Sequence, residues 1–392
     1  MCILPKIGWS QNHFDSALIK SADQVLVGAE RASLYIDKLK GKNVALVVNP
    51  TSEVFGEHLV DFLISKDILI KKVFAPEHGF RGTADAGERV KDAIDQKTGI
   101  PLKSLYGKNK KPTIEDLAGI DIVVFDIQDV GVRFYTYIST MHYVMQACAE
   151  NGVDFMVLDR PNPNGFYVAG PVLQMNQKSF VGMHPVPIVH GLTVGEFAQM
   201  VNNEGWLGDG LKCNLQVVLL TGWTHKDLYQ LPVKPSPNLP NMTSVYWYPT
   251  LGLFEGTNVN AGRGTDFPFQ TFGSPTIQNA PFSYTPVSKP GAKYPKYKGK
   301  KCFGRDLREF PIDSFYNEPG IQIGYVLWAY ENTGNQNEFF LKNHFYGRLA
   351  GTANLQNQIE LEFSVLRIQN GWTPEIEKYL VIRKKYLLYK DF

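Results

Sequence analysis

Hydrophobic runs alternate with amphipathic segments along the first half of the chain. The runs are rich in Val, Ile and Leu without polar alternation, which is typical of strands buried on both faces of a sheet; they span residues 43–49, 68–75, 120–127, 153–159 and 214–220. Three segments between them have the apolar spacing of helices, at residues 57–66, 139–151 and 193–205. Strands that alternate with helices in this way predict parallel βαβ units.

The pattern changes after residue 231. The segment LPVKPSPNLP at 231–240 holds four prolines in ten residues, and proline continues neither a helix nor a central strand. Beyond it we expect Gly- and aromatic-rich loops as far as residue 281, a lysine-rich stretch, and helices at 324–333 and from 355 onward. The sequence therefore predicts a doubly wound α/β domain at 24–231, followed by a smaller α+β domain at 232–392.

Composition narrows the class of protein. With 392 residues, of which 44% are hydrophobic and 20% charged, the chain has material for two packed domains and is not a disordered protein. Its 40 Lys and Arg residues against 38 Asp and Glu leave a net charge of +2. This charge is too small to create an electrostatic field over the whole molecule that would attract nucleic acid. No run approaches the roughly 20 apolar residues of a membrane helix, so we expect no membrane insertion.

Polar residues follow four of the predicted strands. The carboxyl ends of parallel strands share one edge of the sheet, where ligands bind in open α/β folds. The residues there are Asn49 after the first strand, Glu77, His78 and Arg81 after the second, Asp126, Asp129 and Arg133 after the third, and Asp159, Arg160 and Asn162 after the fourth. Asn162 alone is typical of turn chemistry. The convergence of four such loops favours a small-molecule site.

Glu77 is the most informative of these residues. It directly follows an apolar strand, with Phe74 and Phe80 nearby in the sequence, so we expect its carboxyl to be partly removed from water. Desolvation raises a carboxyl pKa and suits a general acid. The alternative is that Glu77 pairs with Arg81 or caps a helix. The neighbouring His78 is either an orienting donor or base, or a structural hydrogen-bonding group.

Two further segments carry candidate chemistry. His190 precedes a helix that we expect to begin near Thr193, and Thr193 with Glu196 fits a capping box, so Glu196 is structural while the role of His190 stays open. The segment 253–275 mixes glycines and aromatics with polar groups, which suits a polyhydroxylated ring; its alternative is an ordered surface loop. The polar residues of this segment are Glu255, Asn258, Arg263 and Asp266.

Several signatures are absent. The chain has no GxGxxG, GxxxxGK[ST], HExxH or GxSxG motif. The predicted parallel sheet therefore does not by itself indicate that a dinucleotide binds, and we expect no cofactor. The four cysteines form no CxxC pair, which argues against a zinc cluster. The six lysines between residues 289 and 301 are interpreted as a solvated basic loop rather than as a site for an anionic polymer.

Six motifs taken together resemble those of the exo-β-N-acetylmuramidase family NamZ. They occur in matching order, and the resemblance extends from about residue 24 to the end of the chain. The motifs are APEHGFRG (75–82), DIQDVGVRFYTYISTM (126–141), LDRPNPNG (158–165), PIVHGLTVGEFA (187–198), PSPNLPN (235–241) and LFEGTNVNAGRGTDFPF (253–269).

The resemblance implies an enzyme that removes β-1,4-linked N-acetylmuramic acid from the non-reducing ends of peptidoglycan fragments. It implies a Rossmann-like domain, a smaller C-terminal domain and an active site in the cleft between them. The proposed catalytic glutamate of the family falls in its PEHG motif and matches Glu77. The resemblance also implies a periplasmic or secreted protein, although no signal peptide is visible in residues 1–20.

Glycoside hydrolysis by such an enzyme needs an acid and a second group. Glu77 is the expected acid, with Asp129 or Glu255 as the second group, unless the 2-acetamido group of the substrate attacks and Asp129 orients it. The lactyl carboxylate of N-acetylmuramic acid requires a cation, for which arginine is best suited. Our first choices are Arg133 and Arg160, ahead of Arg81 and Arg263. Tyr135 and Tyr137 either contact the sugar or belong to the core.

Two alternatives remain at this point. One is a non-catalytic cell-wall sugar-binding protein that uses the same cleft. The other is a metal-dependent hydrolase with His78, Asp126 and His190 as ligands, although these residues match no standard ligand spacing.

Overall fold

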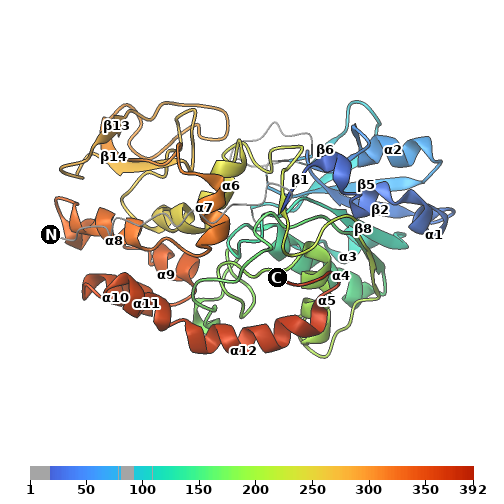
Figure 1. Cartoon of the computed structure of the whole chain (residues 1–392). Helices are drawn as coiled ribbons and strands as arrows, with labels where there is room; N and C mark the ends of the chain where they lie inside the picture. Colours follow the sequence, from blue (N-terminus) through green and yellow to red (C-terminus); the bar gives the residue numbers. More distant parts are fainter. Residues whose placement is uncertain (1–17, 78, 81–91, 108) are drawn as a thin grey trace.

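The largest element of the protein is a seven-stranded sheet (Figure 1). The computed structural model describes residues 18–77, 79–80, 92–107 and 109–392. The strand order is β10-β9-β8-β2-β5-β7-β6, and all neighbours are parallel except β6 and β7. The strands are β2 (Val44–Val48), β5 (Ile70–Ala75), β6 (Ala93–Ile94), β7 (Pro101–Ser104), β8 (Ile122–Asp126), β9 (Asp154–Leu158) and β10 (Leu215–Val218).

All five predicted strands are confirmed, as β2, β5, β8, β9 and β10. From β2 the chain proceeds outward through β5 and β7, then returns to the other side of β2 and continues through β8, β9 and β10. The carboxyl ends of β2 and β8 therefore lie next to each other. The prediction of an α/β protein built on a large, mainly parallel sheet is confirmed.

Helices cover both faces of this sheet. Ala45 and Val47 of β2 belong to a core shared with α4 (Tyr137–Asn151) and α5 (Val194–Asn203). The alternate residues of β2, such as Leu46, belong to a second core, with α2 (Leu59–Ser65). Since successive side chains of a strand point to opposite faces, a strand covered on both sides is apolar throughout.

The start of α5 is built as expected. Thr193 is its N-cap residue: the Thr193 hydroxyl accepts from Glu196 N at 3.2 Å, and Glu196 Oε2 accepts from Thr193 N at 2.9 Å. The predicted capping box is confirmed, and Glu196 is also buried against His225, whose Nε2 lies 3.0 Å from the carboxylate.

A smaller C-terminal part follows the sheet. It begins with α6 (Met242–Leu251) and the 3-10 helix η6 (Gly252–Gly256), where we had expected loops, so that expectation is wrong for these residues. A three-stranded antiparallel sheet and six further α-helices follow: β12 (Thr271–Ser274), β13 (Phe282–Tyr284), β14 (Cys302–Asp306), α7 (Ile312–Asn317), α8 (Gly324–Glu331), α9 (Phe345–Ala350), α10 (Asn354–Glu360), α11 (Val365–Asn370) and α12 (Thr373–Arg383).

Several short elements accompany these sheets and helices. Two small two-stranded sheets pair β1 (Ile19–Lys20) with β11 (Leu228–Tyr229) and β3 (Glu53–Val54) with β4 (Glu57–His58). Two one-turn helices are α1 (Ile36–Leu39) and α3 (Ile114–Leu117). No helix among the described residues is long and apolar enough to cross a membrane.

The end of the chain returns to the large sheet. Figure 1 shows α12 running back toward α5. The Tyr379 hydroxyl donates to His190 O at 2.6 Å, and the Tyr389 hydroxyl donates to the buried carboxylate of Asp159 at 2.6 Å. One hydrophobic core continues from the sheet into the C-terminal part. The domain boundary between residues 231 and 232 stays a prediction.

Candidate functional site

A cavity of about 70 Å³ lies beside the carboxyl end of β5. Its lining combines residues that follow β5 and β8 with residues from segments 236–248 and 263–269. They are Glu77, Phe134, Tyr135, Thr136, Ser236, Asn238, Leu239, Tyr248, Arg263 and Phe269. Of the predicted site residues, the structure thus brings Glu77, Tyr135 and Arg263 together around one space.

Glu77 is half-buried at this cavity and is held by hydroxyl groups. Thr136 Oγ1 donates to Glu77 Oε2 at 3.3 Å, and Tyr106 also hydrogen-bonds the carboxylate. Burial, together with the charge of Glu77, raises the pKa of Tyr106, so its hydroxyl stays protonated and able to donate. Two hydroxyls thus orient the Glu77 carboxyl. The predicted neighbours His78 and Arg81 lie outside the described residues.

Arg263 and Glu255 form an ion pair at the cavity. Arg263 Nε donates to Glu255 Oε1 at 3.1 Å, and the guanidinium lies over the Phe269 ring, 5.0 Å from its centroid. Burial raises the pKa of Glu255, but the positive charges of Arg263 and Lys296 outweigh burial and hold that pKa below its ordinary value. Glu255 is therefore ionised and acts as a counterion. In the described part of the chain, Nε is the only guanidinium nitrogen of Arg263 with a hydrogen-bond partner.

Asp129 lies behind the cavity wall as a buried carboxyl group. Its Oδ2 accepts from Gly131 N at 2.7 Å, whereas its buried Oδ1 has no hydrogen-bond partner among the residues described. Tyr135 and Tyr248, which line the cavity, are close enough to Asp129 for its charge to raise their pKa values, although burial raises those values more. Burial raises the pKa of Asp129 to about 7.

His190 lies beside Asp129, with 3.9 Å between its Nε2 and Asp129 Oδ2. Burial lowers the pKa of His190 to about 3, so the ring is neutral near pH 7. Its Nδ1 accepts from Leu192 N at 3.2 Å, and the ring packs on Phe197. His190 is thus a buried neighbour of Asp129 and does not line the cavity.

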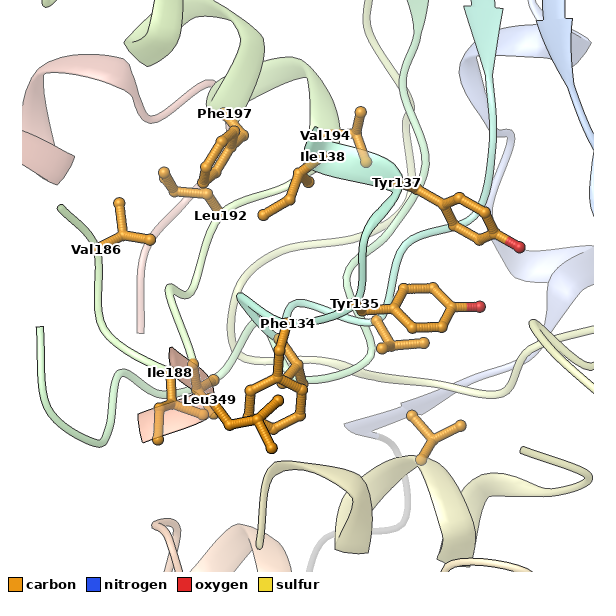
Figure 2. Close-up of a cluster of buried hydrophobic side chains, with 14 of the residues drawn as sticks. Phe134, Tyr135, Tyr137, Ile138, Val186, Ile188, Leu192, Val194, Phe197 and Leu349 are labelled. Atoms are coloured by element: carbon orange, nitrogen blue, oxygen red, sulfur yellow. The ribbon is translucent and has the colours of Figure 1, made fainter. Parts of the chain in front are cut away.

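Tyr135 and Tyr137 have a core side and a polar side. Figure 2 shows both rings at the edge of a hydrophobic cluster, with their hydroxyls pointing to the same side, away from Leu192 and Phe197. The Tyr135 hydroxyl donates to Pro235 O at 2.6 Å, and the Tyr137 hydroxyl lies next to Asn49. The rings thus pack in the core, whereas contact of either hydroxyl with a sugar stays a prediction.

The structure gives Arg133 and Arg160 partners within the protein. Arg160 Nε and Nη2 donate to Asp126 at 2.6 and 2.9 Å, and Nη2 also donates to Glu53 O. Arg133 donates to Pro171 O, Val186 O and Leu349 O; both guanidinium groups are buried, and neither lines the cavity. Because both guanidinium groups are buried away from the cavity and bonded to protein groups, these arginines have structural surroundings, contrary to our preference for them as carboxylate ligands.

The three predicted asparagines bind the backbone around them. Asn49 Oδ1 accepts from Thr51 N at 2.9 Å. Asn162 Nδ2 donates to Leu192 O, and Asn162 Oδ1 accepts from Asn164 N. Asn258 Nδ2 donates to Glu338 O. For Asn162 this is the turn chemistry considered from the sequence. None of the three lines the cavity.

The residues suggested for a metal are not arranged as ligands in the described structure. Both carboxylate oxygens of Asp126 are bonded to Arg160, so they are not free to bind an ion. Among the residues that the structure describes, no group of three His, Cys, Asp or Glu side chains is placed to hold a metal. His78 lies outside the described residues.

Sequence reasoning missed several residues around Glu77. Tyr106 comes two residues after the end of β7, a strand that we had not predicted, so the rule that ligands bind at strand carboxyl ends was not applied there. Thr136 stands between two tyrosines that we did consider. Tyr248 and Phe269 reach the cavity from the C-terminal part; Phe269 belongs to the segment 253–275 considered from the sequence, whereas only the assembled fold identifies Tyr248.

Comparison with known proteins gives concordant results. Family profiles of the exo-β-N-acetylmuramidase NamZ match residues 44–243 for the N-terminal domain and 246–389 for the C-terminal domain. The chain is 41% identical over 374 residues to the peptidoglycan β-N-acetylmuramidase NamZ of Bacillus subtilis strain 168, which covers 91% of this chain and 89% of that protein.

Two crystal structures of DUF1343 family proteins from Bacteroides fragilis are also similar. The first is 43% identical with a TM-score of 0.88, and the second is 30% identical with a TM-score of 0.75. Each match covers 94% of this chain and 99% of the other. Similarity therefore extends over both the large sheet and the C-terminal part.

Proposed function

Since the chain belongs to the exo-β-N-acetylmuramidase NamZ family, we propose that it is a glycoside hydrolase that releases β-1,4-linked N-acetylmuramic acid from the non-reducing ends of peptidoglycan fragments. One observation carries the proposal: Glu77 of the PEHG motif and Arg263 line the same cavity. An acid and a cation together suit a substrate with a glycosidic oxygen to protonate and a carboxylate to bind. Because peptidoglycan lies outside the cytoplasmic membrane, we also propose a periplasmic or secreted location.

The strand order supports a Rossmann-like interpretation of the large sheet. Two halves, β2-β5-β7 and β8-β9-β10, proceed outward from a central pair, as in doubly wound sheets that bind ligands at the point where the order reverses. Asn49 follows one central strand and Asp129 follows shortly after the other. We infer that the cavity belongs to a cleft between this domain and the C-terminal part.

We assign the acid role to Glu77. The glycosidic oxygen takes its proton as the bond to the anomeric carbon breaks, and the Thr136 and Tyr106 hydroxyls keep the carboxyl oriented during that transfer. In the second step, Glu77 accepts a proton from the water that attacks the anomeric carbon. The same carboxyl is thereby returned to its protonated form.

We assign a supporting role to Asp129. In this mechanism, the carbonyl oxygen of the 2-acetamido group attacks the anomeric carbon as the glycosidic bond breaks, and so closes a five-membered oxazolinium ring, as in substrate-assisted families. The water of the second step then breaks the new bond between that oxygen and the anomeric carbon, which restores the acetamido group. The Asp129 Oδ1 atom has no partner among the residues described and would accept the acetamido N–H. Glu255 is the weaker choice for a nucleophile, because its carboxylate is already paired with Arg263.

We assign recognition of the lactyl carboxylate to Arg263. Glu255 holds its Nε, which leaves Nη1 and Nη2 to form a fork of two hydrogen bonds with a carboxylate. Arg133 and Arg160 lack such free donors at the cavity.

The proposal is tested with para-nitrophenyl β-N-acetylmuramic acid, the corresponding N-acetylglucosaminide and EDTA throughout. We expect release from the muramic substrate alone, and its loss in Glu77→Gln, while Glu377→Gln, a change at an exposed residue of α12, stays active. Folded wild-type protein that releases neither sugar would contradict the proposal. Activity retained in folded Glu77→Gln would contradict the role of Glu77, and binding without release would favour a sugar-binding protein.

A further inference from the structure

Lys296 differs from the lysines around it. The lysine-rich stretch was expected to be a solvated loop, and Lys293, Lys298 and Lys300 are indeed exposed. Lys296 instead points its ammonium group into the protein, where Nζ donates to the carbonyl oxygens of Phe254, Thr257 and Val259 at 3.0, 2.6 and 3.2 Å.

The acceptors of Lys296 belong to the segment that carries the ion pair of the site. Phe254 is in η6 beside Glu255, whose own carbonyl oxygen is 3.4 Å from Nζ, and Thr257 and Val259 follow directly. Carbonyl groups at a helix end lack partners within the helix and carry partial negative charge. A lysine ammonium with three donors satisfies several of them at once.

Further hydrogen bonds join the same two segments. Asn260 Nδ2 donates to Lys296 O at 2.9 Å and to Arg263 O at 3.1 Å, and the Tyr297 hydroxyl donates to Asn258 O at 2.9 Å. The positive charge of Lys296 also acts on the Glu255 carboxylate. Lys296 thus lies behind the Glu255–Arg263 pair, connected to both by backbone and by charge.

We propose that Lys296 is a positioning residue for recognition of the muramic carboxylate. Its ammonium fixes segment 254–263, so that Glu255 holds Arg263 with its free nitrogens directed at the substrate. This inference rests on the proposed function, because it assumes that Arg263 binds the lactyl carboxylate. Loss of the ammonium removes a donor from the carbonyl groups of Phe254, Thr257 and Val259 and releases the segment that carries Arg263.

The test compares Lys296→Met with Lys298→Met, its matched control at an exposed lysine two residues along. With para-nitrophenyl β-N-acetylmuramic acid we expect KM to rise about tenfold or more in Lys296→Met, the effect of losing one charge-assisted hydrogen bond. We expect kcat to change much less, and Lys298→Met to match the wild type. Lys296→Arg, which keeps the charge, should recover part of the lost affinity.

A purely structural role would give a different result. It would lower the thermal midpoint and the amount of active enzyme, and so reduce apparent kcat at an unchanged KM. That result, or a wild-type KM in folded Lys296→Met, overturns the proposal. If Lys296→Met does not fold, Tyr297→Phe decides. This variant removes the hydroxyl that donates to Asn258 O and should raise KM to a smaller extent; an unchanged KM overturns the proposal. An inactive wild-type protein would instead refute the proposed function.

Discussion

The protonation of Asp129 depends strongly on the fold. Burial raises its pKa to about 7 from an ordinary value of 3.8, and the neighbouring His190 is neutral and supplies no charge. The folded protein therefore keeps a proton that the unfolded chain has lost. Between about pH 4 and pH 7, the contribution of Asp129 makes the folded state progressively less stable as the pH rises.

Asp129→Asn should remove this dependence. We expect the variant to unfold at a higher urea concentration than the wild type at pH 8, with a much smaller difference at pH 4, and to lose most of its hydrolytic activity. The exposed control Asp209→Asn should follow the wild type at both pH values. If the free energy of unfolding of Asp129→Asn and of the wild type changed with pH in the same way, ionisation of Asp129 would not destabilise the folded protein, and the prediction would be wrong.

Arg263 offers a second prediction at the level of one residue. Arg263→Gln should raise KM for the muramic substrate about tenfold to a hundredfold, the effect expected for loss of charge-assisted hydrogen bonds to a carboxylate. Arg308→Gln, at an arginine paired with Asp306 away from the cavity lining, serves as control. An unchanged KM in Arg263→Gln would assign the carboxylate to another cation.

Single residues also show why these roles were difficult to predict. Arg133 and Arg160 follow strands, as Glu77 does, but their partners come from distant segments: Leu349 O is 216 residues from Arg133. No local pattern indicates whether a guanidinium binds such a carbonyl group or a ligand. Glu77 was predictable because its position depends only on the end of one apolar strand.

At the level of elements, α6 connects the C-terminal part to the cavity. It presents Tyr248, and Asn241 caps its start by accepting from Ser244 N at 3.0 Å. Aromatic residues and Pro249 give this segment low helix propensity, so the helix depends on burial among other elements and was not predicted. The central strands were predictable because burial on both faces requires continuous apolar runs, whereas β7, with the sequence PLKS, lacks that signal.

Removing the cap of α6 should affect both stability and catalysis. Asn241→Ala should lower the free energy of unfolding by about 1 kcal/mol, measured from the urea midpoint. Because α6 positions Tyr248 at the cavity, kcat/KM should fall as well. Ser364→Ala, which removes the comparable cap of α11, should destabilise the protein without that change in kcat/KM. Equal kinetic effects in both variants would refute a specific role for α6.

At the level of the whole molecule, the two parts of the chain share one core and a buried polar contact. The Asp159 carboxylate accepts from Thr193 Oγ1, Gly195 N and the Tyr389 hydroxyl. Burial raises the pKa of Asp159 to about 6, against the effect of these donors. Since Tyr389 lies near the end of the chain, we expect the sheet and the C-terminal part to unfold together.

Tyr389→Phe tests this coupling. It leaves a buried carboxylate with one donor fewer, which should cost about 1–3 kcal/mol. The loss should be larger at pH 8 than at pH 5, because removal of the donor disfavours the ionised form of Asp159. We expect calorimetry to show one transition at a lower midpoint. Separation into two transitions would contradict the coupling of the two parts.

The contact between Asp159 and Tyr389 spans 230 residues and has a consequence for folding during synthesis. The strands of the large sheet leave the ribosome long before Tyr389 does, and they can pair while the rest of the chain is still being made. Until Tyr389 arrives, the Asp159 carboxylate at the end of β9 has an incomplete set of donors and is more open to water. The arrival of Tyr389, rather than the pairing of the strands, therefore completes the set of donors around Asp159.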